Sequence, residues 1–252
     1  MLIDTHCHPY LPPLDAATAD VLANARCAGV SAFIVPAYDT VSWSHVSQLS
    51  ETHPDLHPAY GLHPWQAAQP LDLADLTIRL RHPRTVAVGE IGLDTKIDVP
   101  LDFQIRVFRD QLSLARELDL PVILHNRGAF DEMADILARD GLVRGVLHAF
   151  SRSLDVARPF LDLGLSFGFG GSITRPTARR PRRAAADLPL DRILLETDAP
   201  SIGLQDVPAG SSEPRHVVDV ALAIAGIRGL SLDTIAAQTT RNARELFDLP
   251  DA

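Results

Sequence analysis

Lysine is almost absent from this sequence. The 252-residue chain has 23 basic residues, and Lys96 is its only lysine. Enzymes that form a Schiff base with a carbonyl substrate need a lysine as the nucleophile. Because Lys96 lies in a loop pattern beyond a predicted strand, the sequence argues against Schiff-base chemistry.

Cysteine is also scarce, and long apolar runs are missing. The two cysteines, Cys7 and Cys27, form no CxxC pair and are too few for a disulfide framework. Such usage is typical of a reducing compartment. No stretch of about 18 uncharged apolar residues is present, so we expect no membrane span. No secretory signal pattern precedes the first predicted strand, so we expect a cytoplasmic protein.

The charge balance is acidic. The formal net charge is −9, and the sequence pI is about 5.5. This balance argues against a protein that coats nucleic acid. It does not exclude a nuclease, which brings phosphates to metal ions at one local site. Nothing in the sequence indicates a stable protein partner, and we expect a monomer.

Apolar runs with β-branched residues alternate with longer segments of helical period along the whole chain. We predict strands at Leu2–His6, Ala32–Ala37, His57–Leu62, Val86–Ile91, Val122–His125, Gly145–Ala149, Leu165–Phe169 and Ile193–Thr197. We predict helices at Asp15–Ala28, Ser42–Thr52, Leu73–Arg81, Asp102–Leu118, Phe130–Arg139, Ser153–Leu163, Arg179–Ala186, Pro214–Gly226 and Ser231–Phe247.

This alternation of strands and helices indicates a parallel sheet. About 250 residues is a typical length for a TIM-type (β/α)₈ barrel. We therefore predict one α/β barrel domain spanning residues 1–252, with an open doubly wound sheet as the alternative. The least regular stretch, Ala199–Ser212, follows the eighth predicted strand and would lie at the mouth of a barrel.

Histidines and acids stand where the predicted strands end. The first strand runs into His6-Cys7-His8, and strand alternation puts the two histidines on one side. HxH is a weak signal by itself. The pattern recurs, however, at other strand ends, with His63, Glu90, His125, His148 and Asp198. The carboxyl ends of barrel strands converge on one face, where active sites lie. One shared metal site explains the repetition better than independent accidents. Nitrogen and oxygen ligands without a thiolate suit Zn, Mn, Ni or Fe, and suit Mg less well.

The remaining ionisable residues near these motifs have less decided roles. His45, His53, His57, His82 and His216 fall on helix or loop patterns and are interpreted as solvated or structural. Asp4 fits either a strand start or a partner of a metal ligand, and Glu196 fits either a partner of a ligand or a structural group.

Taken in order, the motifs resemble those of the TatD family of metal-dependent hydrolases, a branch of the amidohydrolase-like barrels. The resemblance covers almost the whole chain. It rests on DTHCH at the start, YGLHP at 60–64, VGEIGLD at 88–94, PVILHNR at 121–127, HAFS at 148–151, ETDAP at 196–200 and QTTRNARELF at 238–247.

The resemblance implies a site for two divalent cations, here Zn, Mn or Mg, that activates a water molecule. It implies that His6, His8 and Asp198 bind the first cation, that His125 and His148 bind the second, and that Glu90 bridges both. Asp198 and Glu90 would then be the catalytic carboxylates, with Asp198 taking the proton of the water.

Other positions bear on the substrate. His63 fits neither ligand set and is interpreted as a contact to a substrate phosphate or leaving group. Arg127 follows His125 on the same strand face and either clamps a phosphate or forms an ion pair at a helix start. Arg175, Arg179, Arg180, Arg182 and Arg183 form either a solvated face or a basic lip. The family often has RGxxNEP after ETDAP and a tyrosine after GLD. Here Ala209, Ser212 and Thr95 stand at the altered positions, which puts the choice of substrate in doubt more than hydrolysis.

These residues support three functional hypotheses. The leading one is a TatD-like deoxyribonuclease or phosphodiesterase, with DNA or another phosphodiester as its substrate. The second is an amide, lactone or ester hydrolase of the wider amidohydrolase group. The third is a metal-binding scaffold without catalysis, which the open, acid-rich ligand set argues against.

Overall fold

The computed structural model describes residues 1–141 and 144–250 and shows eight parallel strands. Each strand pairs with the next one in the chain, from β1 to β8. The strands are β1 Leu2–Asp4, β2 Val30–Pro36, β3 Leu56–Tyr60, β4 Ala87–Asp94, β5 Val122–Arg127, β6 Gly145–Leu147, β7 Ser166–Phe169 and β8 Ile193–Leu195. This in-order parallel pairing is the topology of a (β/α)₈ barrel.

The two edge strands meet, which rules out the open sheet. The amide of Thr5 donates to the carbonyl of Leu195 at 2.9 Å, and the amide of Asp198 donates to the carbonyl of His6 at 2.8 Å. Beyond the regular strands, Cys7 and Ala199 form a parallel bridge. The seam between β1 and β8 is therefore closed by segments that carry His6, His8 and Asp198.

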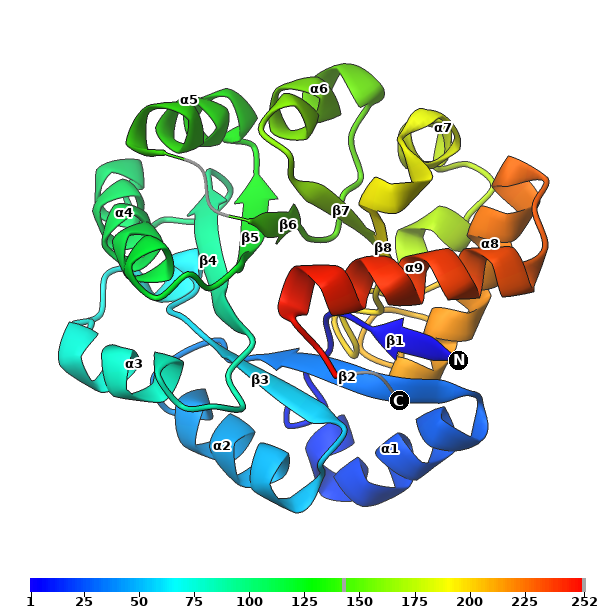
Figure 1. Ribbon diagram of the computed structural model, residues 1–252, viewed down its shortest axis with the longest axis horizontal. Helices are drawn as coiled ribbons and strands as arrows, with labels where there is room; N and C mark the ends of the chain where they lie inside the picture. Colours follow the sequence, from blue (N-terminus) through cyan, green and yellow to red (C-terminus); the bar gives the residue numbers. More distant parts are fainter. Residues whose placement is uncertain (142–143, 251–252) are drawn as a thin grey trace.

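Helices α1 to α8 surround the barrel, whereas α9 lies across one of its ends, as Figure 1 shows. They are α1 Thr18–Cys27, α2 Ser42–Thr52, α3 Leu73–Leu80, α4 Leu101–Glu117, α5 Phe130–Asp140, α6 Leu154–Asp162, α7 Arg179–Asp187, α8 Val217–Arg228 and α9 Leu232–Phe247. Short 3₁₀ turns precede two of them, at Leu14–Ala17 and Pro214–His216. The expectation of single long helices at 15–28 and 214–226 is therefore corrected, because each first turn has the tighter 3₁₀ geometry.

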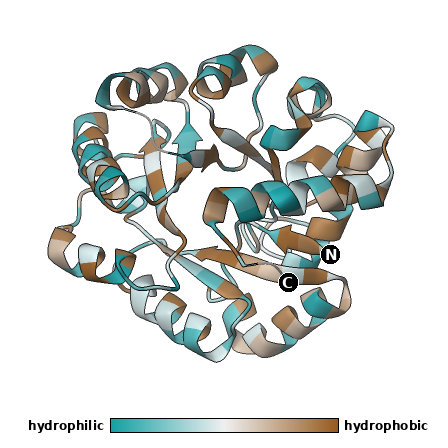
Figure 2. Ribbon diagram, viewed as in Figure 1, coloured by the Kyte–Doolittle hydropathy of each residue, from teal (hydrophilic) through white to brown (hydrophobic). Residues whose placement is uncertain are grey.

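Two apolar layers build the core. The larger lies between the sheet and the outer helices, and Figure 2 shows the apolar residues on the strands and on the inner sides of the helices. The smaller fills the barrel interior with Ile3, Ala32, Ile34, Ala59, Ala87, Ile123, Val146 and Leu194. Helix α9 crosses one end of the barrel (Figure 1), and its Ala243 and Phe247 cover this interior layer from that side.

The interior layer explains why the polar residues gather at the other end. Alternate residues of a strand face the same way, so a residue two positions after an inward apolar side chain also points inward. His125 follows Ile123 in this manner, His148 follows Val146, and Glu196 follows Leu194. The same alternation that fills the barrel therefore directs ionisable groups into its mouth.

The length and apolar character of the helices bear on whether any of them could span a membrane. Among residues 1–141 and 144–250, no single helix is long and apolar enough to cross a bilayer. The segments Pro214–Arg228 and Leu232–Phe247 meet the criteria only as a pair that is bent by 113°.

Candidate metal centre

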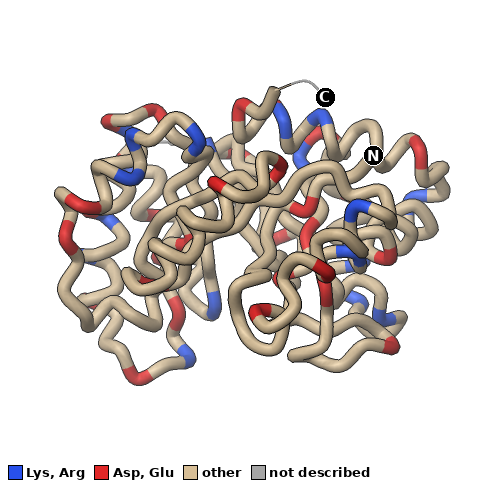
Figure 3. Tube along the Cα trace, turned by 90° about the horizontal axis from the view of Figure 1, so that it is seen from below, with Lys and Arg blue, Asp and Glu red and all other residues tan. Residues whose placement is uncertain are grey.

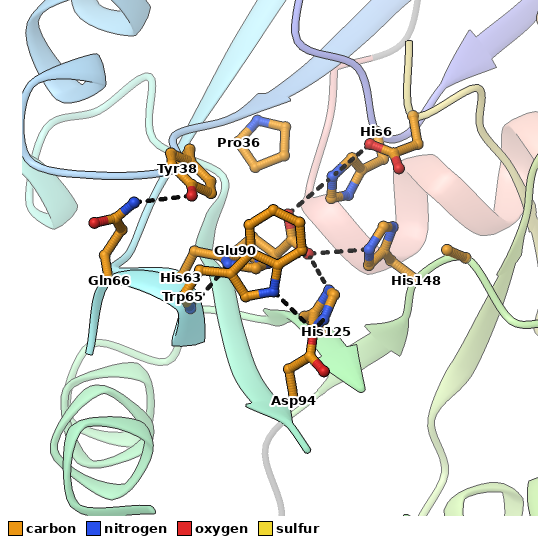
Figure 4. Close-up of polar contacts among 12 residues, drawn as sticks. His6, Pro36, Tyr38, His63, Trp65, Gln66, Glu90, Asp94, His125 and His148 are labelled. Carbon is orange, nitrogen blue, oxygen red and sulfur yellow. Dashed lines mark hydrogen bonds and ion pairs between the residues drawn. The ribbon is translucent and has the colours of Figure 1, made fainter. Parts of the chain in front are cut away.

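The structure brings all six residues of the expected ligand set into one cluster at the carboxyl ends of the strands. Figure 4 shows His6, His125 and His148 around Glu90. Glu90 lies on β4 and His125 on β5, whereas the other four lie directly after β1, β6 and β8: His6, His8, His148 and Asp198. A cavity of about 660 Å³ opens over the cluster. Five strands end one or two residues earlier than expected, namely β1, β2, β3, β6 and β8. Because β1 ends at Asp4, His6 and His8 belong to the segment that continues along the seam.

Glu90 occupies the centre of this cluster. One carboxylate oxygen, Oε1, lies 3.0 Å from His125 Nδ1 and 3.0 Å from His148 Nε2. The other, Oε2, lies 3.2 Å from His6 Nε2. The two oxygens of one carboxylate thus face two different groups of imidazoles.

Asp198 lies on the His6 and His8 side. Its Oδ1 is 3.3 Å from His8 Nε2 and 3.8 Å from His6 Nε2, and those two nitrogens are 3.1 Å apart. The Asp198 backbone is left-handed, with φ of 51°, a region that aspartate and asparagine tolerate better than most residues. This conformation is a local feature that turns the carboxylate into the barrel mouth.

Groups behind the imidazoles fix which nitrogen faces the centre. His8 Nδ1 is 3.1 Å from the carbonyl of Pro36, which only accepts, so Nδ1 carries the proton and Nε2 presents a lone pair. His125 Nε2 lies 3.3 Å from Asp94 Oδ2, which leaves its Nδ1 facing Glu90. His148 Nδ1 lies 3.5 Å from Glu196 Oε1, behind the Nε2 that faces Glu90.

This donor set fits divalent cations. Lone pairs of imidazole nitrogens point at carboxylate oxygens and at one another, and such contacts are repulsive unless a proton or a cation lies between them. Carboxylates and carbonyls behind the histidines are the usual partners of metal-binding imidazoles. Three overlapping groups of donor atoms lie close enough to hold an ion, and they include His6 with His8 and Glu90, and His125 with Glu90 and His63.

Electrostatics keep the carboxylates of the centre charged. Burial alone raises the pKa of Glu90, but the surrounding imidazoles, led by His148, outweigh burial and hold that pKa well below its usual range. Burial likewise raises the pKa of Asp198, and the contact with His8 contributes most to bringing it below the usual value. Burial lowers the pKa of His148, but Glu90 and Glu196 raise it well above the ordinary value.

His63 differs from the other histidines in the cluster, although its Nε2 lies 3.3 Å from Glu90 Oε1. Its Nδ1 accepts a hydrogen bond from the backbone amide of Trp65 at 3.2 Å. In the neutral ring the proton is therefore on Nε2, which at the cavity wall is a donor directed toward Glu90 Oε1 rather than a metal ligand. The backbone amide of Trp65 can only donate, so it fixes this tautomer of His63.

Three further residues support the centre, and the sequence left their roles open or unnoticed. Asp4 accepts from the amide and hydroxyl of Thr197 at 3.0 and 2.7 Å, which joins β1 to β8 below the site. Glu196 accepts from the amide of Ala149 at 2.5 Å while facing His148. Asp94, the last residue of the GLD motif, accepts from the indole of Trp65 at 2.7 Å while facing His125. The sequence does contain a signal for the position of Glu196, because it follows the inward-facing Leu194 by two residues.

Arg127 lies at the end of β5, exposed, on the wall of the cavity. Its guanidinium has no ion-pair partner among residues 1–141 and 144–250, so the alternative of an ion pair at a helix start finds no support there. Of the altered family positions, Thr95 and Ala209 are exposed and Ser212 is buried.

The arginines after β7 are largely engaged by the protein itself. Arg175 donates to the carbonyl of Gly203, Arg182 donates to that of Ile173, and Arg183 pairs with Asp187. Arg179 and Arg180 remain exposed. The three engaged side chains favour the solvated face over a basic lip. Figure 3 shows basic and acidic residues interspersed along the chain.

Comparison with known proteins agrees with this geometry. The family described as TatD related DNase matches residues 3–248. The chain belongs to the TatD-related DNase family. A metal-dependent hydrolase of Bacillus subtilis, YabD, is 34% identical over 98% of this chain and 99% of its own length. A metal-dependent hydrolase of Escherichia coli, YjjV, is 39% identical over 98% of both chains. The crystal structure of YjjV, a TatD homologue, superposes with a TM-score of 0.94 over 99% of this chain and 98% of that one.

Membership in the TatD family confirms the resemblance that the motifs indicated and makes this protein a metal-dependent hydrolase. The hypothesis of a metal-binding scaffold without catalysis is accordingly set aside. The TIM-type barrel expected from the alternation of strands and helices is likewise confirmed.

Proposed function

We propose that the six clustered residues hold two divalent cations. His6, His8 and Asp198 bind one of them, His125 and His148 bind the other, and Glu90 bridges the two. The observation that carries this proposal is the division of Glu90, whose Oε2 faces His6 while Oε1 faces His125 and His148. When bound, such a pair of cations activates a water molecule and polarises the bond that is hydrolysed.

The substrate that this centre supports best is a phosphodiester of DNA. The family description names a DNase, and the cavity presents a buried N–H donor on His63 and an exposed guanidinium on Arg127. Both groups suit phosphate oxygens, and an arginine can grip them bidentately. Asp198 lies at the cavity wall as an acceptor for the proton of the attacking water. We place the enzyme in the cytoplasm, in keeping with its two free cysteines. We further propose that it acts as a monomer.

The test measures metal content beside hydrolysis. Chelator-treated protein is reloaded with Zn²⁺, Mn²⁺ or Mg²⁺ and assayed on short single-stranded DNA, with amide, lactone and carboxylic ester substrates in parallel. We expect two equivalents of metal and cleavage of DNA. Saturation at one equivalent contradicts the bridging role of Glu90. Turnover of an amide, lactone or ester without cleavage of DNA replaces the deoxyribonuclease by the wider amidohydrolase alternative.

A further inference from the structure

Trp65 stands at the rim of the cavity with much of its ring exposed. The chain has two tryptophans, and their environments contrast: Trp43 is 1% exposed, whereas Trp65 is 45% exposed. Trp65 lines the same cavity as Glu90, His125 and Arg127. It follows the HP dipeptide that carries His63, so it comes into the site with a residue that faces Glu90 (Figure 4).

The orientation of the Trp65 ring is fixed from behind. Its Nε1 donates to Asp94 Oδ2 at 2.7 Å, and the other oxygen of that carboxylate accepts from the amide of Lys96 at 2.8 Å. The ring of His63 meets it edge to face at 5.2 Å and 87°. Tyr38 meets it at 6.2 Å and 89°. The hydroxyl of Tyr38 accepts from Gln66 at 2.8 Å, so this second ring is fixed as well. A large aromatic surface is thus exposed and pre-oriented.

The neighbours of this surface identify the ligand chemistry. An aromatic platform beside a guanidinium and an N–H donor matches a base joined to a phosphate, since bases stack on aromatic rings while phosphates take charged and N–H donors. We propose that Trp65, flanked by Tyr38, forms a stacking subsite for one nucleobase next to the phosphate that is hydrolysed. This subsite rests on the proposed function. A base inside a duplex is covered on both faces by its neighbours, so the subsite accepts a base of a single strand.

A binding experiment reads the stacking directly. Metal-loaded protein is titrated with thymidine 5′-monophosphate while tryptophan fluorescence is recorded. The control ligand is 2-deoxyribose 5-phosphate, which has the same sugar and phosphate but no base. We expect the nucleotide to quench Trp65 and the sugar phosphate to leave the signal unchanged. In Trp65→Phe the quenching disappears, because Trp43 is buried and its Nε1 donates to the carbonyl of Gly61.

A kinetic experiment separates stacking from the hydrogen bond to Asp94. Trp65→Phe keeps an aromatic face and loses the N–H, whereas Trp65→Leu loses both. On a short single-stranded oligonucleotide we expect Trp65→Leu to lower kcat/KM about 5- to 150-fold, as removal of one stacked base does elsewhere. Trp65→Phe should retain most of the activity. Phe103→Leu is the matched control, because Phe103 is 42% exposed on α4 and is not among the residues that line the cavity.

An oligonucleotide with one abasic position completes the test. Moved along the strand, the abasic residue should lower kcat/KM of the wild type at one position only, and at that position Trp65→Leu should show no further loss. Equal impairment of Trp65→Phe and Trp65→Leu would show that the bond to Asp94 matters instead, and would overturn the subsite. If DNA is cleaved and neither variant differs from wild type, the subsite fails while the nuclease stands. If DNA is not cleaved but the nucleotide still quenches Trp65, the nuclease fails while the subsite stands.

Discussion

Asp198 combines a left-handed backbone with a position between His6 and His8, and this combination makes its role testable. Asparagine tolerates the same backbone region, so Asp198→Asn keeps the local shape and removes only the basic oxygen. We expect hydrolysis to fall about 10²–10⁴-fold, the usual cost of losing a general base, with little change in Tm. The measurement is the rate on the best substrate at metal content matched to wild type.

The control for this change is Asp206→Asn. Asp206 is an exposed acid in the same irregular segment after β8, and it is not among the residues that line the cavity. Its variant should keep the wild-type rate. An undiminished rate in Asp198→Asn would contradict the assignment, and Glu196 would be the next acid to test.

The strand pattern in the sequence predicted which residues lie at the barrel mouth. His125 and His148 follow inward apolar residues by two positions, so alternation alone placed them at the mouth. The hydrogen bond from Trp65 to Asp94 could not be predicted in this way, because it joins the turn after β3 to the end of β4. The sequence also could not predict which nitrogen of His63 carries the proton, because that depends on a hydrogen bond from the backbone amide of Trp65.

At the scale of elements, β7 depends on a glycine beside the metal centre. A Cβ added at Gly168 would lie 2.1 Å from Glu196 Oε2 and 2.7 Å from its Cδ. Glu196 is fully buried, so it cannot move aside into solvent. We expect Gly168→Ala to lower both Tm and metal affinity, with affinity falling about 10–100-fold as for other lost partners of metal ligands. Thermal unfolding and metal competition with a chelator measure the two effects.

Gly170 in the same segment provides the matched control. A Cβ there would meet no atom closer than 3.6 Å, which is ordinary van der Waals contact. Its φ of −110° suits any residue. Gly170→Ala should therefore leave metal affinity unchanged. Equal effects of the two substitutions would show that the contact with Glu196 is not the cause.

Helix α1 is joined to the segment before β3 by a two-pronged ion pair. Arg26 Nε and Nη2 donate to the two carboxylate oxygens of Asp55 at 2.7 and 2.8 Å. Burial alone raises the pKa of Asp55, but Arg26 outweighs burial and brings the pKa below the usual value. A depressed pKa means that this stabilisation is present above the unfolded value of about 3.9 and is lost as pH falls through the folded value.

The substitution Asp55→Asn tests that coupling. Because both side chains are partly exposed, we expect it to lower the free energy of unfolding by about 0.2–1 kcal/mol at pH 7. The difference from wild type should shrink as pH falls below about 4. Urea unfolding of both proteins between pH 7 and pH 3 measures it. A difference that stays constant over this range would rule out the ion pair as its source.

For the whole molecule, the order of elements was predictable and their ends were not. Period-two and helical patterns located all eight strands and the nine helices of the described residues. Strand ends shifted by up to three residues, as at β4, which continues to Asp94. There, Gly92 permits a close approach of β4 to β5: its φ is 150°, and a Cβ would lie 1.9 Å from the carbonyl oxygen of His125. Such contacts belong to the tertiary structure and leave no periodic signal.

Metal removal should destabilise the whole barrel. The centre joins groups from β4 and β5 with groups next to β1, β6 and β8, and cations that bind only the folded state add stability by mass action. With free metal at 100 times Kd we expect about 2.7 kcal/mol, or roughly 5–11 °C in Tm for a chain of this length. Calorimetry with stepwise additions of metal after chelation tests this. A Tm independent of metal would contradict the proposed ligand set.

The seam between β1 and β8 has a consequence for biosynthesis. His6 and His8 are made long before Asp198, which lies beyond β8. The contact that closes the seam, from Thr5 to Leu195, spans 190 positions. A ribosome must therefore release the eighth strand before the centre can exist. Until then His6 and His8 lack the carboxylate of Asp198. All six donor residues can therefore come together only after Asp198 has been made and the ring of strands has closed.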